Sequence, residues 1–212
     1  MASKRNTILA AAAEEVTAVG LRRTSLTDVA RRAGVSRMTV YREYGDAATL
    51  FRALLTSEVE DVVAEAEAEA GPGQSGRARI VTAVVAGSRR LAGHQLFRRV
   101  LDLDPELVLP MVVDRLGSGQ LHARERLVDL LRLGMAEGSV RALDVTTAAH
   151  VVLLTAQSFV FSSRISDADL ALGDLWSELA ELLDRYLAPS STAPTGAAQP
   201  SRSPDQAEQD TP

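Results

Sequence analysis

The sequence predicts an all-α protein of about nine helices, with a small N-terminal unit joined to a larger helical unit. Apolar residues recur at three- and four-residue spacing through most of the chain, and no stretch alternates like a convincing β-strand. Helix-capping residues and glycines divide these stretches into segments of ordinary helix length. The length of 212 residues fits one large domain, or a small domain joined to a medium one.

The composition is that of a globular protein, with 46% hydrophobic and 24% charged residues. The chain has no cysteine, which excludes disulfides, thiolate nucleophiles and sulfur-ligated zinc sites and fits a cytoplasmic location. The opening MASKRNTILAAAAEEV predicts a helix rather than a signal peptide, because its apolar run is short and ends at Glu14 and Glu15.

Positive charge is concentrated near the N-terminus. Residues 1–52 hold nine Lys and Arg against five Asp and Glu, a net charge of +4, while the whole chain carries −5. The remaining residues therefore carry −9. A basic unit on an acidic body indicates contact with a polyanion, and a merely solvated basic face is the alternative that charge alone leaves open.

The first two helices are predicted from their apolar spacing and their ends. Ile8, Ala12, Val16 and Val19 share one face of a first helix, which Gly20 ends. Ser25 can then cap a second helix, with Asp28 reaching back to it in a shortened capping box, and its apolar face follows (Leu26, Val29, Ala30, Ala33).

A tight turn follows the second helix and leads directly into a third. Gly34 stands where the helix should end, because glycine tolerates the left-handed backbone needed there, and Ser36 can cap the next helix at once. Ala30 is small enough to let the helices cross closely, and Val40 can fill the gap between them. This spacing predicts a helix-turn-helix.

The third helix would expose Arg37, Met38, Thr39 and Arg42 near its N-terminus, the part that enters the major groove of DNA in such motifs. The alternative is a plain antiparallel helix pair within an all-α core. That alternative explains the caps and the glycine, but not two outward arginines beside Thr39 and Tyr41.

The segment TSLTDVARRAGVSRMTVYREYGDAATLF resembles the DNA-binding segment of the tetracycline-repressor (TetR) family of bacterial transcription regulators. The close match covers about residues 5 to 55 and rests on Thr24, Ser25, Val29-Ala30, Ala33-Gly34-Val35-Ser36, Thr39-Val40-Tyr41, Tyr44 and Asp46. We therefore expect a helix-turn-helix DNA-binding domain at 1–48, and an effector-binding and dimerisation domain at 49–188. The predicted DNA contacts are Ser25, Thr27, Ser36, Arg37, Met38, Thr39, Tyr41, Arg42 and Tyr44.

Two features depart from the family pattern. Glu43 stands where the family usually has an aromatic residue that touches the DNA backbone, and Ala47 and Ala48 stand where a lysine often meets a phosphate. We expect Glu43 either to face the phosphates or to pair with Arg42, Arg22 or Arg23. The departures bear on absolute DNA affinity more than on the type of motif.

The rest of the chain continues the helical pattern. Asp46 can cap a long fourth helix that ends before the break GPGQSG at 71–76. Further helices are expected at 77–94, 95–104, 120–138 and 145–163, with a short one near Pro105 and Pro110 and a last one capped by Ser166 and Asp169. The tail at 189–212 is rich in Pro, Ser, Thr, Ala and Gln, and we expect it to be disordered.

The last two helices suggest an interface between two copies. Residues 145–163 contain no Asp, Glu, Lys or Arg, and their length would allow a membrane span. Hydroxyl side chains, Gln157 and His150 favour a buried helix of a soluble protein instead, so we expect no membrane contact. With the last helix, whose apolar side includes Leu179 and Leu182, this helix is expected to form a four-helix bundle in a homodimer; the alternative is that both helices close their own core.

No catalytic, cofactor or metal site is predicted. The three histidines do not share a helical face at close spacing, and there is neither a phosphate-binding glycine loop nor a nucleophile elbow. Polar residues embedded in apolar helices are instead candidates for binding a small-molecule effector. They are His94, Arg98, His122, Gln157 and Ser158, with Met111, Phe159, Phe161 and Trp176 as walls, although plain core packing is favoured for each aromatic residue.

The resemblance implies a mechanism. Two reading helices of a homodimer would enter successive major grooves about 34–36 Å apart on a palindromic double-stranded operator. A small-molecule effector of unknown identity would favour a spacing that no longer fits the grooves, and repression would end. Two alternatives stay open: a DNA-binding module with no small-molecule response, and a helical enzyme or carrier with a disused helix-turn-helix.

Overall fold

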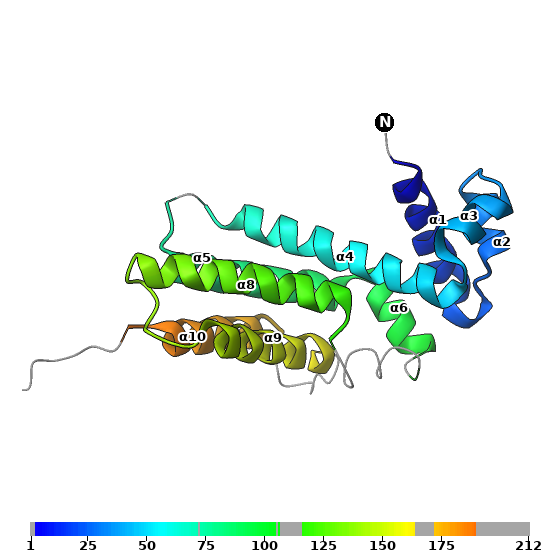
Figure 1. Cartoon of the computed structure of the whole chain (residues 1–212). Coiled ribbons are helices and arrows are strands. Elements are labelled where there is room, and N and C mark those ends of the chain that lie inside the picture. The colour runs from blue at the N-terminus through cyan, green and yellow to red at the C-terminus, as the bar shows by residue number, and fades with distance from the viewer. Residues whose placement is uncertain (1–2, 72, 105, 107–115, 164–171, 190–212) are drawn as a thin grey trace, which may run out of the picture.

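The computed structural model describes residues 3–71, 73–104, 106, 116–163 and 172–189, and every regular element in these ranges is a helix (Figure 1). The all-α prediction is therefore confirmed. The α-helices are α1 (Lys4–Val19), α2 (Leu26–Arg32), α3 (Arg37–Tyr44), α4 (Ala47–Glu69), α5 (Gly76–Gly93), α6 (Gln95–Leu103), α8 (Ser118–Ala136), α9 (Val145–Ser162) and α10 (Leu172–Leu187), with a 3-10 helix η1 (Leu21–Arg23) after α1. The predicted helix near Pro110, the Ser166 cap and the tail after residue 189 lie outside the described residues.

The turn between α2 and α3 forms as the sequence predicts. Gly34 has a φ of +65°, which a glycine adopts without strain. Its N–H donates to the Arg31 carbonyl at 3.3 Å, and the Val35 N–H donates to the Ala30 carbonyl at 3.0 Å. This pair of bonds is a Schellman motif, which satisfies carbonyls that the end of α2 would otherwise leave free. Ser36 follows within two residues and accepts the Thr39 N–H, so α3 begins immediately.

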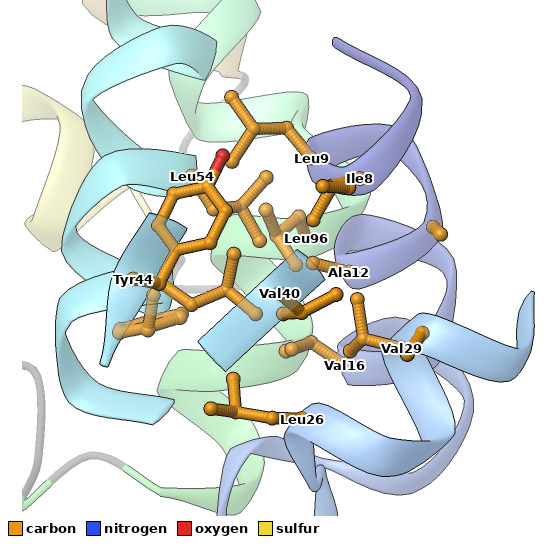
Figure 2. Packing of buried hydrophobic residues seen from close by; sticks show 14 of the residues in the cluster. Ile8, Leu9, Ala12, Val16, Leu26, Val29, Val40, Tyr44, Leu54 and Leu96 are labelled. Carbon is orange, nitrogen blue, oxygen red and sulfur yellow. The ribbon is translucent and has the colours of Figure 1, made fainter. Parts of the chain in front are cut away.

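The first hydrophobic core holds this motif against its support (Figure 2). Val40 of α3 is fully buried between α1 and α2, as predicted for the residue that fills the gap. The core also takes in Leu54 of α4 and two α6 residues, Leu96 and Val100. This core thus continues past the predicted domain boundary between residues 48 and 49, into α4 and α6. The position of the boundary stays a prediction.

An ion-pair cluster fixes α2 on α1. Arg32 reaches Glu15 at 2.8 Å and Glu14 at 3.2 Å, and Glu15 is buried. These hydrogen bonds, first that to Glu15, raise the pKa of Arg32. These ion pairs join α1 and α2 at the edge of the first core.

The second core lies among α5, α8, α9 and α10, while α4 runs from the first unit along this bundle (Figure 1). Two helices cross closely at Gly76 and Gly134, where a Cβ added to Gly76 would lie 2.6 Å from the Gly134 Cα. Leu179 of α10 is fully buried in this core. Its predicted place in a seam between two chains is therefore wrong: it belongs to the half of α10 that closes the chain's own core.

The two units also meet where α6 ends beside the segment that follows α1. Gly20 has a φ of +86°, which favours glycine, and a Cβ on it would lie 3.0 Å from Leu103 Cδ1, so that side chain would have to shift. The buried Asp104 accepts the Leu21 N–H at 2.9 Å through Oδ2, and its Oδ1 lies 3.4 Å from the Arg22 Nε. One carboxylate thus fixes the start of the helix-turn-helix unit to the end of α6.

Replacing Asp104 with Ala should lower the free energy of unfolding by about 1–3 kcal/mol, because the Leu21 N–H loses its acceptor in a half-buried site. Replacing Glu106 with Ala is the matched control, since Glu106 also pairs with Arg22 but at the exposed surface. That change should cost less than about 1 kcal/mol. Urea unfolding monitored by circular dichroism measures both. Equal losses in the two variants would show that the buried bond to Leu21 contributes nothing beyond the surface pair.

Candidate DNA-binding surface and effector cavity

Helix α3 presents its N-terminal half to solvent. Met38 is the most exposed large hydrophobic residue among those described, at 73% of its full exposure, and Arg37 and Arg42 are also exposed. Val40 and Tyr44 form the opposite, buried side of the helix. The predicted outward face therefore exists, and a long apolar side chain that no protein group covers stands at its tip.

Arg37 and Tyr41 form a pair one helical turn apart. The guanidinium carbon of Arg37 lies 4.9 Å from the Tyr41 ring centroid, and Nη2 donates to the Tyr41 hydroxyl at 3.2 Å. These contacts place the Arg37 guanidinium against Tyr41 on the exposed face, and they do not neutralise its positive charge. Thr39 is held as well, since its hydroxyl lies 2.8 Å from that of Ser36. Arg37, Tyr41, Ser36 and Thr39 therefore each have a side-chain partner within α3 or its cap.

The net positive charge of the N-terminal unit lies on cations without an internal acid. Arg22, Arg31 and Arg32 are held in ion pairs. Among the described residues, the other cations of residues 1–52 have no carboxylate within ion-pair distance, although the charge of Arg52 acts on Asp46: Lys4, Arg5, Arg23, Arg37, Arg42 and Arg52. The internal pairs use Glu14, Glu15 and Asp28, while Asp46 caps α4 and its pKa is lowered, first by the hydrogen bond from the Thr49 N–H. The surface charge available to a polyanion is positive.

One predicted contact, Tyr44, takes another place, while Ser25 and Thr27 remain on the surface. Tyr44 is buried in the first core, and burial, followed by the charge of Glu43, raises the pKa of its phenol (Figure 2). It supports α3 from behind, so its predicted role as a DNA contact is corrected to a core role. Ser25 is exposed and caps α2 by accepting the Asp28 N–H at 3.1 Å. Thr27 is exposed on the first turn of α2.

The departures from the motif are all on the surface. Glu43, Ala47 and Ala48 are exposed. Within the described ranges Glu43 has no ion pair, because Arg22 turns to Asp104 and the Arg23 Nε donates to the Val19 carbonyl at 2.7 Å. No ion pair of Glu43 with Arg42, Arg22 or Arg23 is found among the described residues, and the effect of Glu43 on DNA binding stays a prediction.

A cavity of about 410 Å³ lies in the second unit between α4, α5, α6, α8 and α9. A volume of this size is typical of small-molecule sites. Its walls are mainly aliphatic, with Leu55 and Val59 from α4, Leu91 from α5, and Leu153 and Val160 from α9. Gly119 allows the close α4–α8 crossing beside it, since a Cβ there would lie 2.9 Å from the Val59 Cβ.

Of the predicted effector residues, Arg98, Gln157 and Phe161 line this cavity. His94 and His122 are not part of its lining, and His94 Nε2 instead lies 3.0 Å from Glu58 Oε2. Met111 lies outside the described residues. The other predicted candidates are also elsewhere: Ser158 is exposed on the outer side of α9, and Phe159 packs near Trp176 in the second core with ring centroids 6.5 Å apart.

The sequence did not identify Gln120, Phe97 or Arg52 as part of the lining. Gly119 beside Gln120 was the available signal, because a glycine within a helical pattern allows a neighbouring helix to approach closely. Gln120 Oε1 accepts the Gly117 N–H at 2.7 Å, which leaves its Nε2 buried without a hydrogen-bond partner. Gln157 Oε1 is likewise buried without a partner.

Helix α9 has an uncharged outer face. Thr147, Val151, Leu154 and Ser158 follow one another at helical spacing and are all exposed, and we name them the α9 stripe. By length and composition α9 could cross a membrane, and it is the one helix in the described ranges that could. On α10, Leu182 is 46% exposed, three residues from the buried Leu179. The last two helices thus close their own core with one side and leave apolar groups uncovered on another.

The described residues contain no group of three or more His, Asp or Glu side chains that could hold a metal ion. The histidine pair to Glu58 is a single contact between α4 and the turn before α6.

Comparison with known proteins finds a family model for the N-terminal unit and relatives that align over most of the chain. Residues 8–54 match the model of bacterial regulatory proteins of the tetR family. An uncharacterized HTH-type transcriptional regulator of Mycobacterium tuberculosis (strain H37Rv) is 38% identical over 180 residues, which cover 85% of this chain and 92% of that protein. A regulator of the same description from Mycobacterium bovis is 37% identical over the same length, with the same coverage.

Solved structures share the fold at low sequence identity. The transcriptional repressor QsdR of R. erythropolis, from the TetR family, has a TM-score of 0.64 and 17% identity, over 87% of this chain and 95% of QsdR. The regulator FadR of Bacillus subtilis, solved in complex with stearoyl-CoA, has a TM-score of 0.63 and 19% identity, over 86% of this chain and 98% of FadR. The likeness extends through both units.

Replacing Glu43 with Gln should raise the affinity for operator and random DNA alike, by about 0.5–1.5 kcal/mol, because it removes a free negative charge beside the basic face. The gain should shrink as salt is raised. Fluorescence anisotropy with labelled DNA at two salt concentrations measures it. Glu60→Gln is the matched control: Glu60 is also exposed, but it lies roughly 20 Å along α4 from the start of that helix, and the change should leave binding unaltered. Unchanged affinity in Glu43→Gln would place its carboxylate away from the phosphates.

Proposed function

Because the chain belongs to the tetR family of bacterial regulatory proteins, we propose that it is a homodimeric repressor that a small molecule releases from a palindromic operator. Its family places it among DNA-binding transcription regulators with a helix-turn-helix. The proposal adds that the protein represses transcription, that its DNA site is palindromic, that a small-molecule effector releases it and that it is located in the cytoplasm.

The observation that carries the effector response is the position of α6. Phe97, Arg98 and Leu101 on one side of this helix line the cavity. On the other side Leu96 and Val100 belong to the first core, beneath the helix-turn-helix. A molecule that changes the position of α6 must therefore disturb the packing or move the DNA-binding unit.

The end of α6 strengthens that coupling. Asp104 holds the Leu21 N–H, and the Arg99 Nε donates to the Thr17 carbonyl at 3.2 Å. These two hydrogen bonds thus join α6 to the chain just before Gly20 and just after it. Release of DNA follows only if the effector binds better to the α6 position that misaligns the reading helices, since equal affinity for both states shifts nothing.

On the DNA side, the exposed face of α3 is proposed to lie in the major groove. Arg37 and Arg42 are suited to base edges or the groove rim, and the exposed Met38 is suited to apolar contact such as a thymine methyl group. Thr39 and Tyr41 are placed to position the helix through phosphates. Ser25, Thr27 and Ser36 lie at the starts of α2 and α3, where backbone N–H groups face an approaching phosphate.

The dimer is proposed to form through α9 and α10. The α9 stripe and Leu182 are apolar or uncharged and remain uncovered in one chain. A second copy related by a twofold axis would cover them and make a four-helix bundle. The same axis would bring two reading helices to one side, as a palindromic operator requires.

Two other functions receive less support. A DNA-binding module without a small-molecule response has no use for a cavity of about 410 Å³ beside α6. A helical enzyme or carrier with a disused helix-turn-helix would not need an exposed cationic face on α3. FadR of Bacillus subtilis, a regulator of the same fold, was solved with stearoyl-CoA, which supports occupancy of this fold by a small molecule.

Selection of fragmented genomic DNA with the purified full chain tests the DNA function. The expected result is a palindromic site whose two half-sites are protected from hydroxyl radicals about one helical turn, 34–36 Å, apart. Arg37→Ala should weaken that site by about 1–3 kcal/mol. Retention of DNA without any preferred sequence, or protection of a single half-site, would contradict the proposal.

Replacing Leu182 with Glu should convert the dimer into a folded monomer with weakened operator binding. A charge placed in a desolvated seam without a partner costs several kcal/mol, so the dimer dissociation constant should rise at least about 100-fold. Leu133→Glu is the matched control, because Leu133 on α8 and Leu182 are both 46% exposed in one chain. Sedimentation equilibrium should find Leu133→Glu still dimeric. A dimeric Leu182→Glu variant would mean that another surface joins the chains.

A further inference from the structure

We propose that Met38 recognises the C5-methyl group of a pyrimidine in each half-site, so that 5-methylcytosine can replace thymine at that position. This inference rests on the proposed placement of α3 in the major groove and adds the chemical group that one side chain reads. It follows from three features of α3: the direction in which Met38 points, its exposure, and the partners that its polar neighbours already have.

Met38 points away from the first core. Successive residues of an α-helix are about 100° apart, so Met38 lies about 200° round the helix from the fully buried Val40. It lies about 120° from Tyr44, the other buried residue of α3. Met38 also belongs to the first turn of α3, and in helix-turn-helix proteins the N-terminal residues of this helix contact base edges. In the major groove this side chain would therefore lie over the bases.

No protein group covers Met38. It is 73% exposed, about twice the 37% of Tyr41, and these two are the exposed large hydrophobic residues among the described residues up to the end of α3. A single exposed hydrophobic residue is common on protein surfaces and needs no partner by itself. The position of Met38 on the reading helix gives it a role, because the groove would remove the side chain from water.

The polar neighbours of Met38 are held to either side of it. Arg37 Nη2 donates to the Tyr41 hydroxyl at 3.2 Å, and the guanidinium carbon lies 4.9 Å from the Tyr41 ring centroid. The Thr39 hydroxyl lies 2.8 Å from that of Ser36. Met38 lies between these two pairs, and neither pair covers it. The first turn of α3 therefore presents an apolar side chain between two polar groups.

The base edges in the major groove offer such a side chain one matching group. They present ring nitrogens, carbonyl oxygens and amino groups, apart from the C5-methyl group of thymine. Methionine has no hydrogen-bond donor and its sulfur is a weak acceptor, so against a polar edge it would leave that edge without a partner. Against a methyl group, both apolar surfaces gain by leaving water. Cytosine methylated at C5 carries the same methyl group at the same place, so the side chain reads the methyl group and not the base.

Base analogues in the operator selected by the full chain test this inference. One pyrimidine position at a time is changed in both half-sites, and fluorescence anisotropy measures the affinity. Deoxyuridine in place of thymidine removes the methyl group opposite an unchanged adenine, while 5-methylcytosine and cytosine compare the same methyl group opposite guanine. At the position that Met38 contacts, the methyl group should raise affinity about fourfold in each half-site, and hence about 15-fold in the palindrome. An operator in which no pyrimidine methyl group changes affinity would overturn the inference.

Variants of Met38 assign the methyl effect to this side chain. Met38→Ala removes the apolar group and Met38→Gln keeps its length but ends in an amide, so both should reduce the effect to less than about twofold in the palindrome. Met38→Leu is the matched control, because it keeps an apolar side chain of similar volume and should keep most of the effect. All three variants change an exposed residue, and circular dichroism should find them folded. A methyl effect that survives in both Met38→Ala and Met38→Gln would overturn the inference.

The outcomes also separate this inference from the proposal on which it rests. A palindromic site without any methyl effect would overturn the role of Met38 and leave the proposed repressor standing. A methyl effect confined to a single half-site would support the role of Met38 and contradict the proposed dimer. Binding of DNA without any preferred sequence would overturn both.

Discussion

The bond between the Asp104 carboxylate and the Leu21 N–H joins parts of the chain 83 residues apart, and the arrangement of the two units depends on it. A backbone N–H that loses its acceptor away from solvent is costly, so η1 has to follow the end of α6. Gly20 makes the approach possible, because any side chain there would meet Leu103. Arg22 then extends the contact outward to the surface acid Glu106. The helix-turn-helix is therefore oriented by the body of the protein through fixed bonds, beyond its covalent connection through α4.

The local parts of the DNA-binding unit could be predicted from the sequence because their interactions span few residues. Ser25 and Ser36 each bond an N–H three residues on, and the Gly34 turn closes over five residues. Tyr44 was mistaken for a DNA contact because an aromatic residue with a hydroxyl fits either side of a helix that is only eight residues long. Its burial depends on α1 and α4, which the local pattern does not include.

The cavity and the junction could be predicted only in part, since they are made by helix crossings. Gln157 was identified from its polarity on an apolar helix and Phe161 as a possible wall, but Gln120 lines the cavity where Gly119 lets α8 approach α4. Leu179 and Leu182 illustrate the same limit. Both fit one apolar side of α10 by sequence, yet the tertiary packing buries the first completely and leaves the second half exposed. An amphipathic pattern shows which residues lie on the apolar side of a helix. It does not show which of them pack in the chain's own core and which remain on the surface.

Helix α9 relates the proposed dimer to the proposed effector response, because neighbouring residues on it serve different surfaces. Gln157 lines the cavity while the next residue, Ser158, belongs to the α9 stripe. If a second copy covers that stripe, α9 becomes the fixed wall of the cavity, held by two chains. The opposite wall includes α6, held by its contacts with the helix-turn-helix unit. A ligand between these walls then acts against an immobile helix on one side, so the strain of accommodating it falls on α6. In the proposed dimer, a small shift of α6 would change the spacing of the two reading helices and leave the dimer intact.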